Sequence, residues 1–325
     1  MKLRRRELLR LAGAGALAPA LPSVARALDY PSRPVRLLVG YAAGGAADIV
    51  ARLIAERLSQ RLGQQFIVDN RPGANTSLAT EAVVQAAPDG YTLLLITTSN
   101  ATTPGMYQHL NYDFLRDIAP VAGVIRVGQV MEVNPAVPAK TVPEFIAYAK
   151  ANPGKINMAS GGIGSTPHLA GELFKMMAGV DLVHVPYRGD APALIDMAGG
   201  RCQVMFDLIS ASISFLKSGK LRALAVTSAK RSPALPDLPP IADFLPGYEA
   251  TSFQGVGAPK STPADIVDKL NKEINAVVAD AAFEARLADL GGVGLRGSPA
   301  AFAKLIAAET DKWSRVIKFA GIKPQ

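Results

Sequence analysis

The chain contains two copies of one pattern: a short apolar run, a glycine-rich turn and the start of a helix. The first copy covers residues 35–62, with a buried strand expected over Val35–Val39 and a helix from about Ile49 to Leu62, and the second copy covers residues 155–174. In the second, Ser165 or Thr166 can cap the helix, and Pro167 suits its first turn. Glycine allows a positive φ, and the amides at a helix N-terminus attract anions. The two copies therefore predict two walls of one site for a carboxylate or a phosphate.

The glycine turns also have a simpler interpretation, in which the glycines serve only the geometry of a tight strand-to-helix connection. A dinucleotide site is disfavoured, because Pro167 stands where the fingerprint begun by Gly162 and Gly164 needs its third glycine.

The recurring pattern predicts an α/β fold, and 325 residues are enough for two lobes. A hydrophobic content of 49% with only 6% aromatic residues is typical of that class. The mostly apolar run 121–133 is expected to cross between the lobes, and residues 252–257 to carry the chain back. Five prolines within residues 232–246 predict a surface connection.

Residues 1–27 have the three parts of a signal peptide: a basic start, an apolar run over residues 11–21, and Ala25-Arg26-Ala27. Arg5-Arg6 also fits a twin-arginine signal, with an ordinary secretory signal as the alternative. We therefore expect cleavage after about Ala27 and a periplasmic mature protein. This leader carries a net charge of +5 out of the total of +8. Because only +3 remains for the mature chain, a nucleic-acid partner is not expected.

The sequence offers little for metal or enzyme chemistry, so we expect no metal, no cofactor and no catalytic residue. Cys202 is the single cysteine and is predicted to be a small buried residue. The three histidines form no His-Glu-x-x-His motif. An exported hydrolase using Ser165 and His168 is the alternative, but the surrounding residues do not form a Gly-x-Ser-x-Gly elbow.

Seven short phrases follow one another along the mature chain: Tyr30-Pro-Ser-Arg-Pro-Val-Arg36, residues 40–48, Asn70-Arg-Pro-Gly-Ala74, Ala87-Pro-Asp-Gly-Tyr91, Gly164-Ser-Thr-Pro-His-Leu169, Val185-Pro-Tyr-Arg-Gly189 and Gly199-Gly-Arg201. In number and order they resemble the solute-binding receptors of tripartite tricarboxylate transporters, often called Bug-type receptors.

The resemblance implies a two-lobed periplasmic binding protein of the type II-like α/β class, with a helix-flanked sheet in each lobe. Residues 28–127 and 250–325 would form lobe 1, and residues 128–249 would form lobe 2. A small carboxylate would bind in the cleft between the lobes: a di- or tricarboxylate, an aromatic acid or an amino acid. The receptor, expected to be a monomer, would deliver this ligand to membrane permease subunits. A sensor that feeds a signalling partner is an alternative to transport.

The resemblance also implies a set of ligand-binding residues. It places Ala43, Gly44, Gly45 and Asp48 on one wall with Ser99 nearby, and Gly162, Gly164, Ser165, Thr166, His168, Tyr187, Asp190, Ala191 and Asp207 on the other.

Several of these residues have ordinary structural alternatives. Asp48 can favour the helix dipole without touching a ligand, and His168 can be a buried helix residue with a satisfied ring. Tyr187 can pack at a turn, and Asp207 can cap a helix. The chain departs from the family pattern at residues 75–79, where a more glycine-rich run is expected, so the specificity of that loop stays open.

Overall fold

A computed structural model describes residues 30–323, with the exception of residues 108 and 188. The predicted signal peptide and its cleavage site lie outside the described residues. Within this part of the chain, no helix is both long enough and apolar enough to cross a membrane.

The strands form one continuous sheet with two halves that are joined through the long strand β4. The order is β2-β1-β3-β9-β4-β7-β5-β6, and β8 and β10 also pair with β4. The first half contains β1 (Val35–Val39), β2 (Phe66–Asn70), β3 (Thr92–Thr97), β9 (Thr251–Pro259) and β10 (Gly292–Gly294). The second half contains β5 (Asn157–Ser160), β6 (Val183–Pro186), β7 (Val204–Leu208) and β8 (Arg222–Val226).

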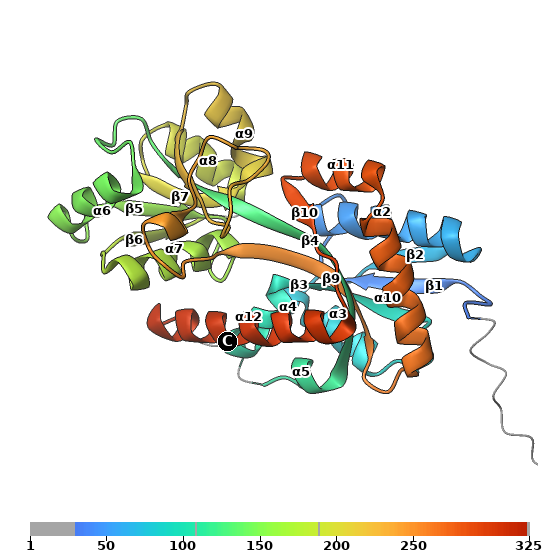
Figure 1. The fold of residues 1–325 in the computed structure, drawn as a ribbon. Coiled ribbons are helices and arrows are strands. Elements are labelled where there is room, and N and C mark those ends of the chain that lie inside the picture. The colour runs from blue at the N-terminus through green and yellow to red at the C-terminus, as the bar shows by residue number, and fades with distance from the viewer. Residues whose placement is uncertain (1–29, 108, 188, 324–325) are drawn as a thin grey trace, which may run out of the picture.

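Strand β4 (Ile118–Val133) passes from one half to the other (Figure 1). It pairs antiparallel with β9 as far as Gly128, and from Gln129 onwards it pairs with β7. The predicted crossing of the apolar run 121–133 is therefore confirmed. Strand β9 brings the chain back beside β4, as predicted for residues 252–257.

Helices cover both halves. The first half carries α2 (Ala46–Leu62), α3 (Ser77–Val84), α4 (Thr98–Met106), α5 (Phe114–Asp117), α10 (Ala264–Val278) and α11 (Ala281–Asp289). The second half carries α6 (Val142–Ala151), α7 (Thr166–Ala178), α8 (Asp190–Ala198) and α9 (Ile209–Lys217). Two short 3-10 turns, η1 (Ala74–Thr76) and η2 (Ile241–Asp243), lie in loops.

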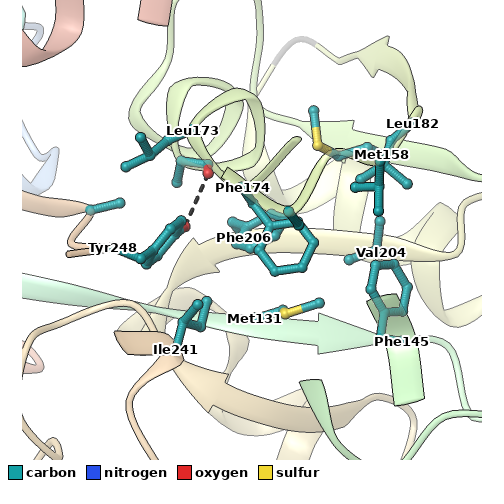
Figure 2. Packing of buried hydrophobic residues seen from close by; sticks show 14 of the residues in the cluster. Met131, Phe145, Met158, Leu173, Phe174, Leu182, Val204, Phe206, Ile241 and Tyr248 are labelled. Atoms are coloured by element: carbon teal, nitrogen blue, oxygen red, sulfur yellow. Dashed lines mark hydrogen bonds between the residues drawn. The ribbon is translucent and has the colours of Figure 1, made fainter. Parts of the chain in front are cut away.

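The core of the second half is built around aromatic residues of α7 and β7 (Figure 2). Phe174 and Phe206 have ring centroids 5.3 Å apart, and both are fully buried. The hydroxyl of Tyr248 donates to the Ala170 carbonyl across 3.0 Å, which satisfies its one polar atom inside this core.

Helix α12 (Pro299–Phe319) packs against both halves (Figure 1). Its beginning contributes Phe302 and Ile306 to a cluster with Leu94 of β3, whereas Trp313 and Val316 belong to the core around Phe174. The predicted division of the chain into lobes, with residues 250–325 in lobe 1, stays a prediction. A helix of 21 residues is about 30 Å long and can reach both cores.

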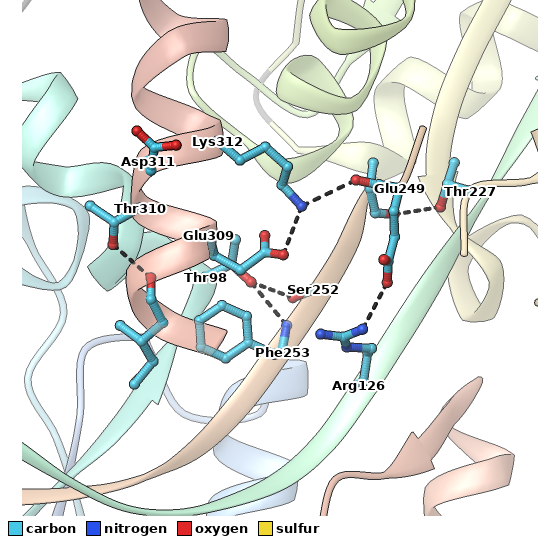
Figure 3. Close-up of polar contacts among 12 residues, drawn as sticks. Thr98, Arg126, Thr227, Glu249, Ser252, Phe253, Glu309, Thr310, Asp311 and Lys312 are labelled. Atoms are coloured by element: carbon cyan, nitrogen blue, oxygen red, sulfur yellow. Dashed lines mark hydrogen bonds and ion pairs between the residues drawn. The ribbon is translucent and has the colours of Figure 1, made fainter. Parts of the chain in front are cut away.

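A polar network ties α12 to the start of β9, where the chain re-enters the first half (Figure 3). Lys312 Nζ donates to the Glu249 carbonyl across 3.1 Å and to Glu309 Oε1 across 2.7 Å. Arg126 of β4 pairs with the Glu249 carboxylate across 2.7 Å. The two crossing strands and α12 are thus linked at one place.

Candidate ligand-binding cleft

A pocket of about 420 Å³ lies between the two halves. Residues that follow β1 and β3 line one wall, and residues that follow β5, β6 and β7 line the other. Ser252 and Gln254 of β9 complete the lining. The carboxyl ends of strands from both halves therefore face one space, which is where open α/β sheets bind ligands.

Five helices begin at this pocket. Their N-cap residues are Gly45 of α2, Thr97 of α4, Ser165 of α7, Gly189 of α8 and Leu208 of α9, and all five line it. Each helix N-terminus carries unpaired amide groups and a partial positive charge. Their convergence makes the pocket attractive to an anion.

Among the described residues, which exclude Arg188 beside Gly189, the lining contains no lysine or arginine, and Asp190 is its one charged residue. Burial raises the pKa of Asp190. Burial and the neighbouring Asp190 also raise the pKa of Asp207, which lies behind the lining. Among the described residues, helix N-termini and neutral hydrogen-bond donors are the groups that would stabilise an anion bound here.

In the first glycine turn, Asp48 holds the backbone instead of lining the pocket. Its Oδ2 atom accepts the Gly44 amide hydrogen across 2.8 Å and a hydrogen bond from Arg52 Nε across 2.9 Å. Its Oδ1 atom accepts from Asn70 Nδ2 across 2.9 Å. Together these hydrogen bonds lower the pKa of Asp48 to about 2, and the bond from Arg52 has the largest effect. The carboxylate is therefore fully engaged within the protein.

His168 has the same position in the second glycine turn. Its Nδ1 atom accepts the Gly164 amide hydrogen across 3.0 Å, and its Nε2 atom lies 3.6 Å from Glu172 Oε1. The imidazole rings of His168 and His184 stack with centroids 3.7 Å apart. The pKa of His184 is lowered to about 4, mainly by burial and to a smaller extent by the neighbouring His168 ring. His184 Nε2 lies 2.7 Å from Ser160 Oγ, which accepts the Gly162 amide hydrogen across 3.2 Å.

The two turns are thus held by equivalent side-chain-to-backbone hydrogen bonds. In each, the third helical residue accepts the amide of a glycine four positions earlier, and both glycines have positive φ: 85° at Gly44 and 76° at Gly164. The amides of Gly44, Gly162 and Gly164 donate to Asp48, Ser160 and His168 inside the protein, so a contact of these glycines with a ligand stays a prediction. Ile163 and Thr166 carry amides of the second turn that make no hydrogen bond within the described residues.

The structure divides the predicted site residues into two groups. Those that line the pocket are Gly45, Ser99, Gly162, Gly164, Ser165, Thr166 and Asp190. Those outside the lining are Ala43, Gly44, Asp48, His168, Tyr187, Ala191 and Asp207. Direct contact of the first group with a ligand stays a prediction.

Tyr187 and Asp207 are turned toward the protein interior. The Tyr187 hydroxyl donates to Asp196 Oδ2 across 2.8 Å and lies 3.5 Å from the Cys202 sulfur, which is buried as predicted. Asp207 is fully buried, and its Oδ1 atom accepts the Leu208 amide across 2.8 Å.

The Ser165 and His168 side chains of the hydrolase alternative are not paired with each other. Ser165 Oγ accepts the backbone amide of His168 across 3.3 Å, whereas the His168 ring contacts Gly164 and Glu172. Within the described residues, no group of three or more His, Cys, Asp or Glu side chains could hold a metal ion.

Sequence reasoning missed several lining residues, among them Tyr41, Asn75, Thr97, Thr98, Ile163, Ser252 and Gln254. The polar run after β3 was the available signal. Thr97 and Asn100 form a capping box, but Pro104 and Gly105 conceal the helix that follows. The remaining residues come together only through folding.

Comparisons with known proteins agree with this geometry. Residues 50–322 match the model of the family described as "Tripartite tricarboxylate transporter family receptor". The chain is 34% identical to Protein BugT of Bordetella pertussis over 96% of this chain and 95% of that protein. It is also similar to two solved structures from Rhodopseudomonas palustris.

The first is Rpa4515 with adipate: 40% identity, 91% of this chain and 100% of that chain covered, and a TM-score of 0.78. The second is MatC with bound malate: 31% identity, 89% and 100% covered, and a TM-score of 0.73. The predicted periplasmic binding protein fold is therefore confirmed. This chain belongs to the tripartite tricarboxylate transporter receptor family.

Proposed function

We propose that this protein captures a small dicarboxylate in the pocket and delivers it to the membrane permease subunits of a tripartite transporter. The observation that carries this proposal is the convergence of five helix N-termini on one pocket. A hydrogen bond from an amide to an ionised carboxylate is worth about 1.5–3 kcal/mol, so a few such bonds give useful affinity. Adipate and malate, the molecules bound to two similar proteins, are both dicarboxylates.

The proposal extends to the whole chain. Residues 1–27 would direct export through the twin-arginine route, and the mature protein would act in the periplasm as a monomer. The two lobes would be residues 28–127 with 250–325 and residues 128–249, with α12 bridging them. The change of partners at Gly128 and Gln129 of β4 supports a hinge at that point. The role is binding and not catalysis, in keeping with a transport receptor family.

A thermal-shift screen of residues 28–325 tests the ligand class. The panel contains succinate, malate, adipate, citrate, benzoate and glutamate. A ligand at a hundredfold excess over its Kd should stabilise the folded protein by about 2.7 kcal/mol. We expect stabilisation by dicarboxylates, and a protein that no carboxylate stabilises would contradict the proposal.

Gly164→Val and Gly179→Val provide a matched pair of variants. Both glycines have positive φ, 76° and 63°, so valine strains the backbone at either position. Gly164 lines the pocket, and a Cβ there would also lie 2.6 Å from Met106 Cε, whereas nothing lies within 4 Å at Gly179. We expect Gly164→Val to abolish ligand stabilisation and Gly179→Val to retain it. Growth on the ligand after deletion of the gene separates transport from sensing, because a sensor's loss should leave uptake intact.

A further inference from the structure

The loop that precedes α3 holds three consecutive residues in a backbone conformation that only glycine adopts freely. The φ angles are 45° at Ala74, 48° at Asn75 and 76° at Thr76. Within the described residues, these are the non-glycine residues with positive φ. The conformation is unfavourable for any residue with a Cβ atom, and especially for a β-branched threonine. Contacts elsewhere must therefore hold this loop.

Helix α4 supplies most of those contacts. Thr103 Oγ1 donates to the Asn75 carbonyl across 2.9 Å, and Asn75 Nδ2 donates to Thr103 Oγ1 across 3.2 Å. On the other side, Thr76 is buried against the end of β1. A Cβ atom on Gly40 would lie 2.6 Å from the Thr76 Cβ, so the two residues pack as closely as a glycine allows.

The strained loop brings one side chain to the pocket. Asn75 lines it, whereas Ala74 and Thr76 do not. The Thr102 hydroxyl donates to the Ser99 carbonyl across 3.0 Å, and the one Thr103 hydroxyl proton is shared between the Asn75 carbonyl and the Ser99 carbonyl, 2.7 Å away. Both hydroxyl oxygens are therefore left to accept from Asn75 Nδ2. This fixes the amide with its nitrogen toward α4. The Oδ1 atom then makes no hydrogen bond within the described residues and is free to accept one.

We propose that Asn75 determines specificity on the first wall of the pocket, where its Oδ1 atom accepts a hydrogen bond from a hydroxyl or amino group of the ligand. The inference rests on the proposed function and narrows it to carboxylates that carry such a donor. A plain diacid leaves Oδ1 without a partner and brings no compensating bond. The strain in residues 74–76 is retained because a relaxed loop would move the amide away from this position.

Malate and succinate test this directly, because they differ by one hydroxyl group. Isothermal titration calorimetry should show that the wild-type protein binds malate about tenfold more tightly than succinate or better. Asn75→Gly removes the amide and suits the backbone, so it should bring that ratio to about threefold or less without lowering Tm. Ala74→Gly relieves strain beside the amide and should raise Tm while keeping the wild-type ratio.

The outcomes separate the two proposals. An unchanged ratio in Asn75→Gly, or a wild-type ratio near one, would overturn the role of Asn75 while leaving dicarboxylate capture intact. If the wild-type protein binds neither diacid, the inference fails. If the wider carboxylate panel also fails, the proposed function fails with it. If Ala74→Gly lowers the ratio of malate to succinate affinity as much as Asn75→Gly does, the specificity comes from the loop conformation. That result would overturn the role of the Asn75 amide.

Discussion

The Nδ1 atom of His168 accepts the Gly164 amide hydrogen across 3.0 Å, and this bond fixes the tautomer and the role of the histidine. A ring nitrogen that accepts cannot carry a proton, so the Nε2 atom carries it and faces Glu172. Asp48 does the same for Gly44 in the other half of the molecule. The two glycine turns are therefore held in shape by side chains that lie outside the pocket lining.

Removing the His168 acceptor should weaken ligand binding. In His168→Leu the Gly164 amide loses its partner, and we expect the Kd for the best dicarboxylate to rise about tenfold or more. His168→Asn places an oxygen near the former Nδ1 position and should stay within about threefold of wild type. Calorimetry at pH 7.5 measures both. Equal affinity in the leucine variant and the wild type would show that the hydrogen bond between Gly164 and His168 does not support ligand binding.

Asp48 should stabilise the folded protein in a pH-dependent way. Its pKa is lowered to about 2, below the value of about 3.9 in an unfolded chain. Its contribution is therefore present above about pH 4 and is lost as the pH falls toward 2. Asp48→Asn should lower the free energy of unfolding by about 1–3 kcal/mol at pH 7. Urea denaturation should show that this difference shrinks at pH 3, and a constant difference would contradict the assignment.

Glu132 should make the folded protein less stable as the pH rises, which is the opposite of the effect of Asp48. It is fully buried, Ser212 Oγ donates to its Oε1 atom across 2.9 Å, and burial raises its pKa to about 8. Because the folded state holds this proton more strongly, stability should fall as the pH rises from about 5 to 8. Glu132→Gln keeps the Ser212 bond and removes the charge. Its Tm should fall less than that of the wild type over the same range, and parallel curves would exclude Glu132 as the source.

Lys312 should stabilise the buried carboxylate of Glu309, which lies three residues earlier on α12. Lys312→Met leaves the Glu309 carboxylate, which is 6% exposed, without its cation. We expect a loss of about 3 kcal/mol, because an unpaired buried charge is costly. Adding Glu309→Gln should recover a substantial part of that loss. A double-mutant cycle on unfolding free energies measures the coupling, and purely additive losses would show that the pair does not interact.

The sequence predicted much of the local structure because the relevant signals lie within a few residues. Strand β1 was predicted with its observed bounds, and Ser165 caps α7 as predicted. Helix α2 begins three residues before the predicted start at residue 49, since Gly45 serves as its N-cap without a side-chain bond. Helix α4 was not predicted, because Pro104 lies inside it and masks the helical pattern.

The sequence by itself determined the α/β class, the crossing run and the two glycine turns at helix starts, since spacing and residue type control these features locally. Tertiary structure alone decided which amides remain free for a ligand. Whether Gly44 and Gly164 donate to a ligand or to Asp48 and His168 depends on side-chain direction, which glycine spacing does not encode. It also decided that Asn75 reaches the pocket, because that requires α4 to hold a backbone conformation that the loop's own residues disfavour.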